Sequence, residues 1–156
     1  MIPALATKTV GIVFPQAIKD NTEFVGSKGS TPVELDTAGW DHVDIFVMFG
    51  AMDIKMATMK LWACDTLGGA YAAVTGGDFG SPDALPTATD DNHLFAWHIN
   101  KLSSLARRFY EVELIPGDGA AGTYAVCWAV LSRGAQEPKS AAARGLTTEL
   151  FIPANP

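Results

Sequence analysis

Hydrophobic and polar positions alternate with a period of two along much of the chain, which is the pattern of strands that bury one face. The segment after Trp40 shows it most clearly, because one face carries only large apolar side chains: Val43, Ile45, Val47 and Phe49. The opposite face carries Asp44, Phe46 and Met48. We therefore expect a strand here with one firmly buried face.

Further strands are predicted downstream. The runs "ATMKLWACD" and "TLGGAYAAVTGGDF" are joined at residues 65–69 by a sequence typical of a tight turn, which predicts two paired strands. The run "HLFAWHIN" places Leu94, Ala96, His98 and Asn100 on one face and Phe95, Trp97 and Ile99 on the other. The segment "KLSSLARR" that follows is predicted to be a connection.

The segment Tyr110 to Arg133 predicts a hairpin of two strands around the loop "PGDGAAG". The first strand alternates, whereas the second strand, "TYAVCWAVL", is apolar on both faces. A strand of that kind is covered on both sides, either by its own domain or by another subunit. The loop itself is interpreted as a bend, since its glycines permit a tight reversal and Asp118 alone cannot hold a metal.

The two ends of the chain are less regular. Residues 1–36 are expected to form an arm with one or two short strands, including "KTVGIVFP" up to Pro15. Residues 134–156 are expected to form a tail with a helical turn at Ser140 to Arg144 that ends at Gly145, and then a short strand "TTELFI". Residues 37–133 would form the core. About seven short strands separated by turns predict an all-β fold, an antiparallel β-sandwich or jelly roll with irregular N- and C-terminal arms.

Composition narrows the possible partners. The chain has 156 residues, enough for one domain, and a net charge of −6 with four arginines, which argues against a nucleic-acid partner. No apolar run approaches the length of a membrane span, and no export signal is visible at the N-terminus, so we expect neither a membrane partner nor secretion. Cys64 and Cys127 lie in apolar runs and are expected to be buried thiols without a disulfide.

Candidate catalytic and metal-binding residues are few. Asp78-Phe79-Gly80 matches a kinase tripeptide by chance, since the other kinase motifs are missing, and no GxSxG elbow occurs. His42, His93 and His98 lack the spacing of zinc ligands, and His93 and His98 would face opposite sides of a strand. We therefore predict that the protein is not an enzyme and that it has no catalytic residues and no cofactor. Asp90 and Asp91 remain as weak calcium candidates.

Aromatic side chains offer a binding alternative. Four tryptophans, with Tyr71 and Tyr124, could form a platform that stacks on sugars if several of them were exposed on one sheet face. A place in the core is favoured for all tryptophans except Trp40, because the other three lie inside apolar strand-like runs: Trp62, Trp97 and Trp128.

The succession "VDIFVMFGAMD", "KLWACDTLGGAYAAVTGGDF", "TDDNHLFAWHINKLSSLARRFYEVELIPGDGAAGTYAVCWAVLSRG" and "EPKSAAARGL" resembles small virion structural proteins of tailed bacteriophages and related prokaryotic viruses. The resemblance covers about residues 36–146 and rests on the order of strands and turns. It implies a non-enzymatic decoration, or cement, protein on the outer surface of a capsid, made in the host cytoplasm. Its partners would be the major capsid protein, copies of itself in a trimer, or both.

Two other functions remain open. A carbohydrate-binding jelly-roll module for host attachment has a similar strand and turn organisation. A single jelly-roll protein that forms the shell itself would also fit the predicted fold.

Overall fold

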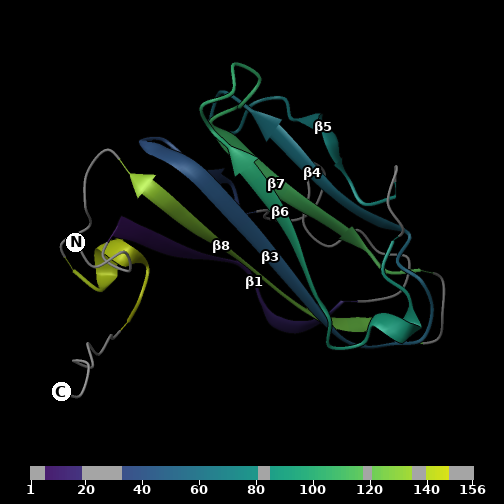
Figure 1. The fold of residues 1–156 in the computed structure, drawn as a ribbon. Coiled ribbons are helices and arrows are strands. Elements are labelled where there is room, and N and C mark those ends of the chain that lie inside the picture. Colours follow the sequence, from purple (N-terminus) through teal and green to yellow (C-terminus); the bar gives the residue numbers. More distant parts are fainter. Residues whose placement is uncertain (1–5, 19–32, 81–84, 118–120, 135–139, 148–156) are drawn as a thin grey trace, which may run out of the picture.

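Eight strands form two four-stranded antiparallel sheets that pack face to face in the computed structural model, which describes residues 6–18, 33–80, 85–117, 121–134 and 140–147 (Figure 1). Sheet A has, in spatial order, β1 (Thr7–Ile18), β8 (Thr123–Gly134), β3 (Trp40–Met52) and β6 (Leu94–Asn100). Sheet B has β2 (Leu35–Asp36), β7 (Phe109–Ile115), β4 (Thr58–Cys64) and β5 (Ala72–Asp78). Two short 3₁₀ helices accompany them, η2 (Ala88–Asp90) and η3 (Ala142–Arg144).

The strand order is that of a jelly roll. The pairs β1 with β8, β2 with β7, β3 with β6 and β4 with β5 are all hydrogen-bonded neighbours. The chain is thus arranged as one long antiparallel double strand that has been rolled up into two sheets. The predicted fold class, an all-β sandwich of jelly-roll type, is confirmed.

The predicted hairpin between residues 110 and 133 is wrong, although both of its strands exist. β7 lies in sheet B between β2 and β4, whereas β8 lies in sheet A between β1 and β3. The connection between them therefore crosses from one sheet to the other and does not reverse the chain within a sheet. Residues 118–120, which include Asp118, lie outside the described residues.

The core lies between the inner faces of the two sheets. β3 contributes the four side chains predicted from its alternation, and all are buried: Val43, Ile45, Val47 and Phe49. β8 contributes smaller ones: Ala125, Cys127, Ala129 and Leu131. Sheet B supplies Met59, Leu61, Val112 and Leu114. Cys64 and Cys127 are buried free thiols in different sheets, and burial raises the pKa of the Cys127 thiol well above its ordinary value.

β1 belongs to the sandwich, so part of the predicted N-terminal arm is core structure. Ile12, Val13 and Ile18 are buried, and β1 continues past Pro15 as an edge strand. Its pairing with β8 shifts register on both sides of Val13. An edge strand with such irregularities accommodates proline because one side of it needs no ladder hydrogen bonds.

The predicted helical turn of the tail is confirmed as η3, and Gly145 ends it in a left-handed conformation with φ of 78°. A Cβ atom at Gly145 would lie 1.6 Å from the Thr9 carbonyl oxygen, so this residue lets the tail pack directly on the backbone of β1. Arg144 is buried beside it. The predicted strand "TTELFI" falls, apart from its first residue, outside the described residues.

We expect Gly145→Val to detach residues 140–147 from β1, because both the positive φ and the contact with Thr9 exclude a side chain. Limited proteolysis with trypsin will then cut after Arg144 much faster than in the native protein. Gly39→Val is the matched control, since Gly39 also has a positive φ but has open space within 4 Å of the position that a Cβ atom would take. Equal cutting rates after Arg144 in all three proteins would contradict this packing.

Candidate functional site

The outer face of sheet A carries an apolar patch. Because side chains alternate along each strand, the residues between the buried positions of β3 and β8 face outward. The outward-facing residues of the neighbouring strands β6 and β1 lie beside them on the same face. We define the apolar patch as Phe14, Phe46, Met48, Leu94, Tyr124, Val126 and Trp128. The exposed fractions are 69% for Phe14, 67% for Tyr124, 52% for Leu94 and 36% for Met48.

Cross-strand contacts hold this patch together. Phe46 pairs with Trp128 in the register of β3 and β8, and their rings stack with centroids 5.5 Å apart. Trp128 is opposite Gly11 on β1, and the Phe14 ring lies over Gly11, where a Cβ atom would be only 3.1 Å from the ring. The patch is therefore a preformed surface whose aromatic rings are ordered by the sheet.

A shallow cleft of about 320 Å³ opens at one end of the patch, bordered by Pro15, Met48, Tyr124 and Val126. The expectation that β8 is covered on both faces holds for one face only within the described residues. The inner face of β8, which has small side chains, is covered by sheet B. Its outer face, with the large side chains, is only partly covered by the described residues, and Tyr124 is largely exposed.

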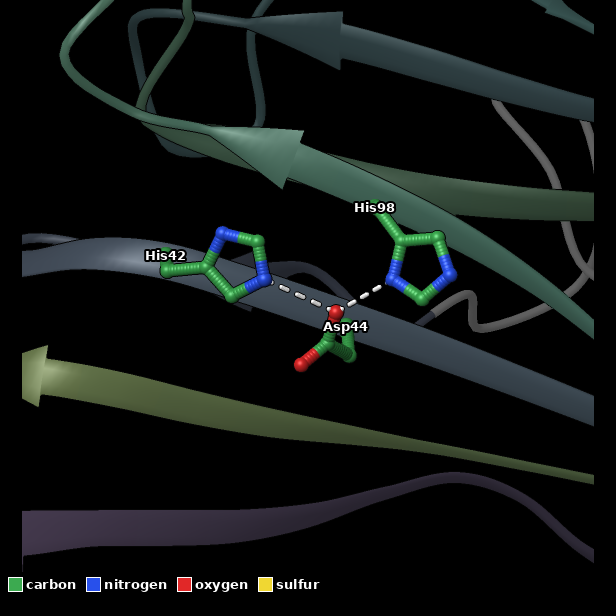
Figure 2. Close-up of side chains that lie close together, drawn as sticks. All are labelled: His42, Asp44 and His98. Atoms are coloured by element: carbon green, nitrogen blue, oxygen red, sulfur yellow. Dashed lines mark hydrogen bonds and ion pairs between the residues drawn. The ribbon is translucent and has the colours of Figure 1, made fainter.

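The other end of the same face is polar and brings together His42 and Asp44 from β3 with His98 from β6 (Figure 2). Asp44 Oδ1 lies 2.9 Å from His42 Nε2 and 2.5 Å from His98 Nδ1, so one carboxylate oxygen accepts a hydrogen bond from each ring. Asp44 and His98 are direct partners in the β3–β6 register. We call these three residues the His-Asp-His cluster.

The His-Asp-His cluster was not predicted from the sequence. His42 and Asp44 are two residues apart and so share a strand face, and this signal was available. The third member, His98, is 54 positions from Asp44 and meets it only through the pairing of β3 with β6. No local spacing reveals that pairing.

Asp90 and Asp91, the calcium candidates, are engaged in local structure. Asp90 closes a capping box with Thr87 at the start of η2, and these hydrogen bonds to Thr87 lower the pKa of its carboxyl group. His93 lies 3.5 Å from the same carboxylate. Asp91 Oδ1 accepts a hydrogen bond from the backbone N–H of Met52 and so ties the segment between η2 and β6 to the end of β3. Asp90 thus caps η2, and Asp91 links its own segment to the end of β3.

The remaining tryptophans have mixed environments. Trp97 is buried and donates a hydrogen bond from Nε1 to the Gly77 carbonyl oxygen, whereas Trp40 packs half-buried against the edge of the core. Trp62 lies half-buried on the outer face of sheet B and donates to Glu113 Oε2. The prediction of a place in the core is therefore confirmed for Trp97. It is wrong for Trp62, which lies on the outer face of sheet B, and for Trp128, which lies on the outer face of sheet A.

Glu111 is a buried acidic residue on the outer side of sheet B. Its Oε2 atom has no hydrogen-bond partner among the described residues. Burial, with a smaller contribution from the nearby Glu34 carboxylate, raises the pKa of Glu111 to about 7. Glu34 in turn accepts hydrogen bonds from Tyr71 and from the backbone N–H of Gly68. Glu111 is therefore protonated in the folded protein under mildly acidic conditions.

Comparison with known proteins gives no relative: no family model, curated protein or solved structure matches this chain. Among the described residues, no helix is long and apolar enough to cross a membrane.

Glu111 predicts a pH-dependent stability. Its folded pKa of about 7 exceeds the ordinary value of 4.5, so the stability contributed by the bound proton is complete below pH 4.5 and is lost as pH rises through 7. Between about pH 4.5 and 8 the free energy of unfolding of the native protein should fall by about 3 kcal/mol relative to Glu111→Gln. Urea unfolding of both proteins at several pH values measures this difference.

The glutamine variant keeps the shape of a protonated glutamate and does not titrate at position 111. The difference between the two proteins therefore excludes the effect of other carboxylates, such as Asp36 and Asp78, whose lowered pKa values change the stability with pH in the opposite direction. Parallel curves of stability against pH for the two proteins would contradict the assigned state of Glu111.

Proposed function

We propose that the protein is a non-enzymatic structural component of a virus particle that docks on the outer surface of the capsid through the apolar patch of sheet A. The single observation that carries this proposal is the patch itself. Four large apolar side chains, Phe14, Met48, Leu94 and Tyr124, are exposed on one sheet face, which also carries the stacked pair of Phe46 and Trp128. Contiguous apolar surface of this kind marks protein interaction sites.

Charge favours a capsid protein as the occupant of the patch over a second copy of this chain. The chain has a net charge of −6, so two copies that meet face to face repel each other. The patch itself consists of uncharged side chains. A neutral or basic shell surface would cover it without that repulsion, and buried aromatic anchors of the kind offered by Trp128 and Tyr124 supply much of the energy of such interfaces.

The viral setting rests on the resemblance to virion structural proteins, and the jelly-roll fold supports it. Jelly rolls occur in viral capsid proteins, in lectins and in cupins, so the fold alone does not determine the function. The exposed patch adds a means of attachment to this fold. A decoration protein needs such an attachment surface, and it needs no catalytic group.

The test is co-sedimentation with purified particles of the virus that encodes the chain. We expect the double variant Met48→Lys/Leu94→Lys to weaken binding to the particles by at least about tenfold, because two charges would have to be desolvated in the interface. Leu105→Lys is the control: Leu105 is an apolar side chain that is more exposed than Met48 and Leu94, and it lies outside the patch, in the connection between β6 and β7. Its binding should equal that of the native protein.

All three proteins should unfold at similar temperatures, since the substituted side chains are exposed. Absence of the chain from purified virions, or equal binding of the double variant, would contradict the proposal. Closed shells formed by this chain alone would instead identify it as the shell-forming capsid protein.

The aromatic side chains of the patch also favour a second candidate, a carbohydrate-binding module. Tyr124 is exposed at the edge of the 320 Å³ cleft, on the same face of β8 as Trp128, and exposed aromatic rings stack on sugar rings. In that case a glycan array would give binders that Tyr124→Ala loses, together with quenching of tryptophan fluorescence. A flat response across the array would exclude this candidate.

A further inference from the structure

We infer that the His-Asp-His cluster on the outer face of sheet A is a binding site for one divalent transition-metal ion such as zinc. The site would be formed by His42 and Asp44 of β3 and His98 of β6 (Figure 2). This inference is independent of the proposed function, because it concerns the polar end of the face and not the apolar patch.

The ligand atoms already converge. His42 Nε2, Asp44 Oδ1 and His98 Nδ1 all lie within 4.8 Å of one another, and both nitrogens point at the same carboxylate oxygen. An ion held at about 2.0–2.2 Å by each of three ligands in tetrahedral geometry needs them about 3.3 Å apart. The distances between ligand atoms would therefore change by at most about 1.5 Å, in side chains that are partly exposed to solvent.

The donor set selects the kind of ion. Two imidazoles and one carboxylate suit zinc and the neighbouring divalent transition metals, whereas calcium takes six to eight oxygen ligands. In the structure each ring directs an N–H group at Asp44. A neutral imidazole carries its proton on either nitrogen, so a shift of that proton to the other ring nitrogen frees the nitrogen that faces Asp44 for the metal.

The surroundings fix the cluster and leave it accessible. The Asp44 side chain is 22% exposed. Val130 of β8 lies directly opposite Asp44 on the side of β3 away from His98. His42 and His98 expose 33% and 65% of their side chains, so an ion can enter from solvent without opening the fold. With three protein ligands, at least one coordination position would remain for water or for a group on another molecule.

Binding would also cross-link the sheet. His42 and Asp44 belong to the inner strand β3, and His98 belongs to the edge strand β6, so a bound ion would fasten the edge strand to its neighbour. A ligand that binds only the folded state stabilises it. With free zinc at about a hundredfold its dissociation constant, we expect the melting temperature to rise by about 5–10 °C.

The test adds zinc chloride alone to the full chain without a histidine tag. Isothermal titration calorimetry measures the binding, and thermal unfolding measures the change in melting temperature. We expect one zinc per chain, and a loss of affinity of more than about tenfold in His98→Ala and in Asp44→Asn. Cobalt(II) in place of zinc should give the visible absorption bands of an ion with nitrogen and oxygen ligands, and these should disappear in His98→Ala.

His93→Ala is the matched control, because His93 has the same chemistry and nearly the same side-chain exposure, 64%, but lies outside the cluster. Its zinc affinity should equal that of the native protein. His98 is exposed on an edge strand, so His98→Ala without metal should melt like the native protein and report on binding alone. The inference is overturned if zinc does not shift the native melting temperature, if His98→Ala retains the native affinity, or if His93→Ala loses as much.

Discussion

The register between β3 and β8 at the centre of sheet A is the constraint on which the rest of the structure depends. Both strands bury one continuous row of side chains against sheet B, and the pairing of Ile45 with Ala129 and of Val47 with Cys127 lies in the middle of these rows. Since side chains alternate, a slip by one residue would move Asp44 and His42 into the core and bring the core residues of β3 to the surface. The cost of burying these polar groups makes the observed register the stable one.

This register also determines what the outer face carries. It places Phe46 beside Trp128, and the pairing of β3 with β6 places Asp44 beside His98. The apolar patch and the His-Asp-His cluster are therefore consecutive parts of one surface. β3 contributes to both, with His42 and Asp44 toward one end and Phe46 and Met48 toward the other.

The strands and their buried faces could be predicted where the pattern is one-sided. The inner row of β3 was predicted in full, because its four large apolar residues contrast with Asp44 on the other face. The orientation of β8 could not be predicted in this way. Both of its faces are apolar, so alternation does not say that Ala129 faces inward and Trp128 outward. Long-range pairing limited the prediction of the site as well. The two strands 109–115 and 123–134 are close in sequence, and a short glycine-containing loop between strands usually indicates a hairpin. In a rolled-up double strand, however, the partner of a strand is set by its distance from the middle of the chain. This is why β8 pairs with β1, and why β3 pairs with β6 so that His98 meets Asp44; the contact of β8 with β3 forms when the double strand rolls up.

The outer face of β8 has side chains that the fold itself does not require. The space between the sheets is filled on the β8 side by small residues such as Ala125 and Ala129, opposite the larger residues of sheet B. The positions of Tyr124, Val126 and Trp128 lie outside that space, where polar side chains would support the sheet equally well and would be better hydrated. Large apolar side chains at these positions increase the risk of aggregation for the free chain. The proposed docking surface would account for them, and the physical argument for that proposal comes from the residues that the core leaves unused.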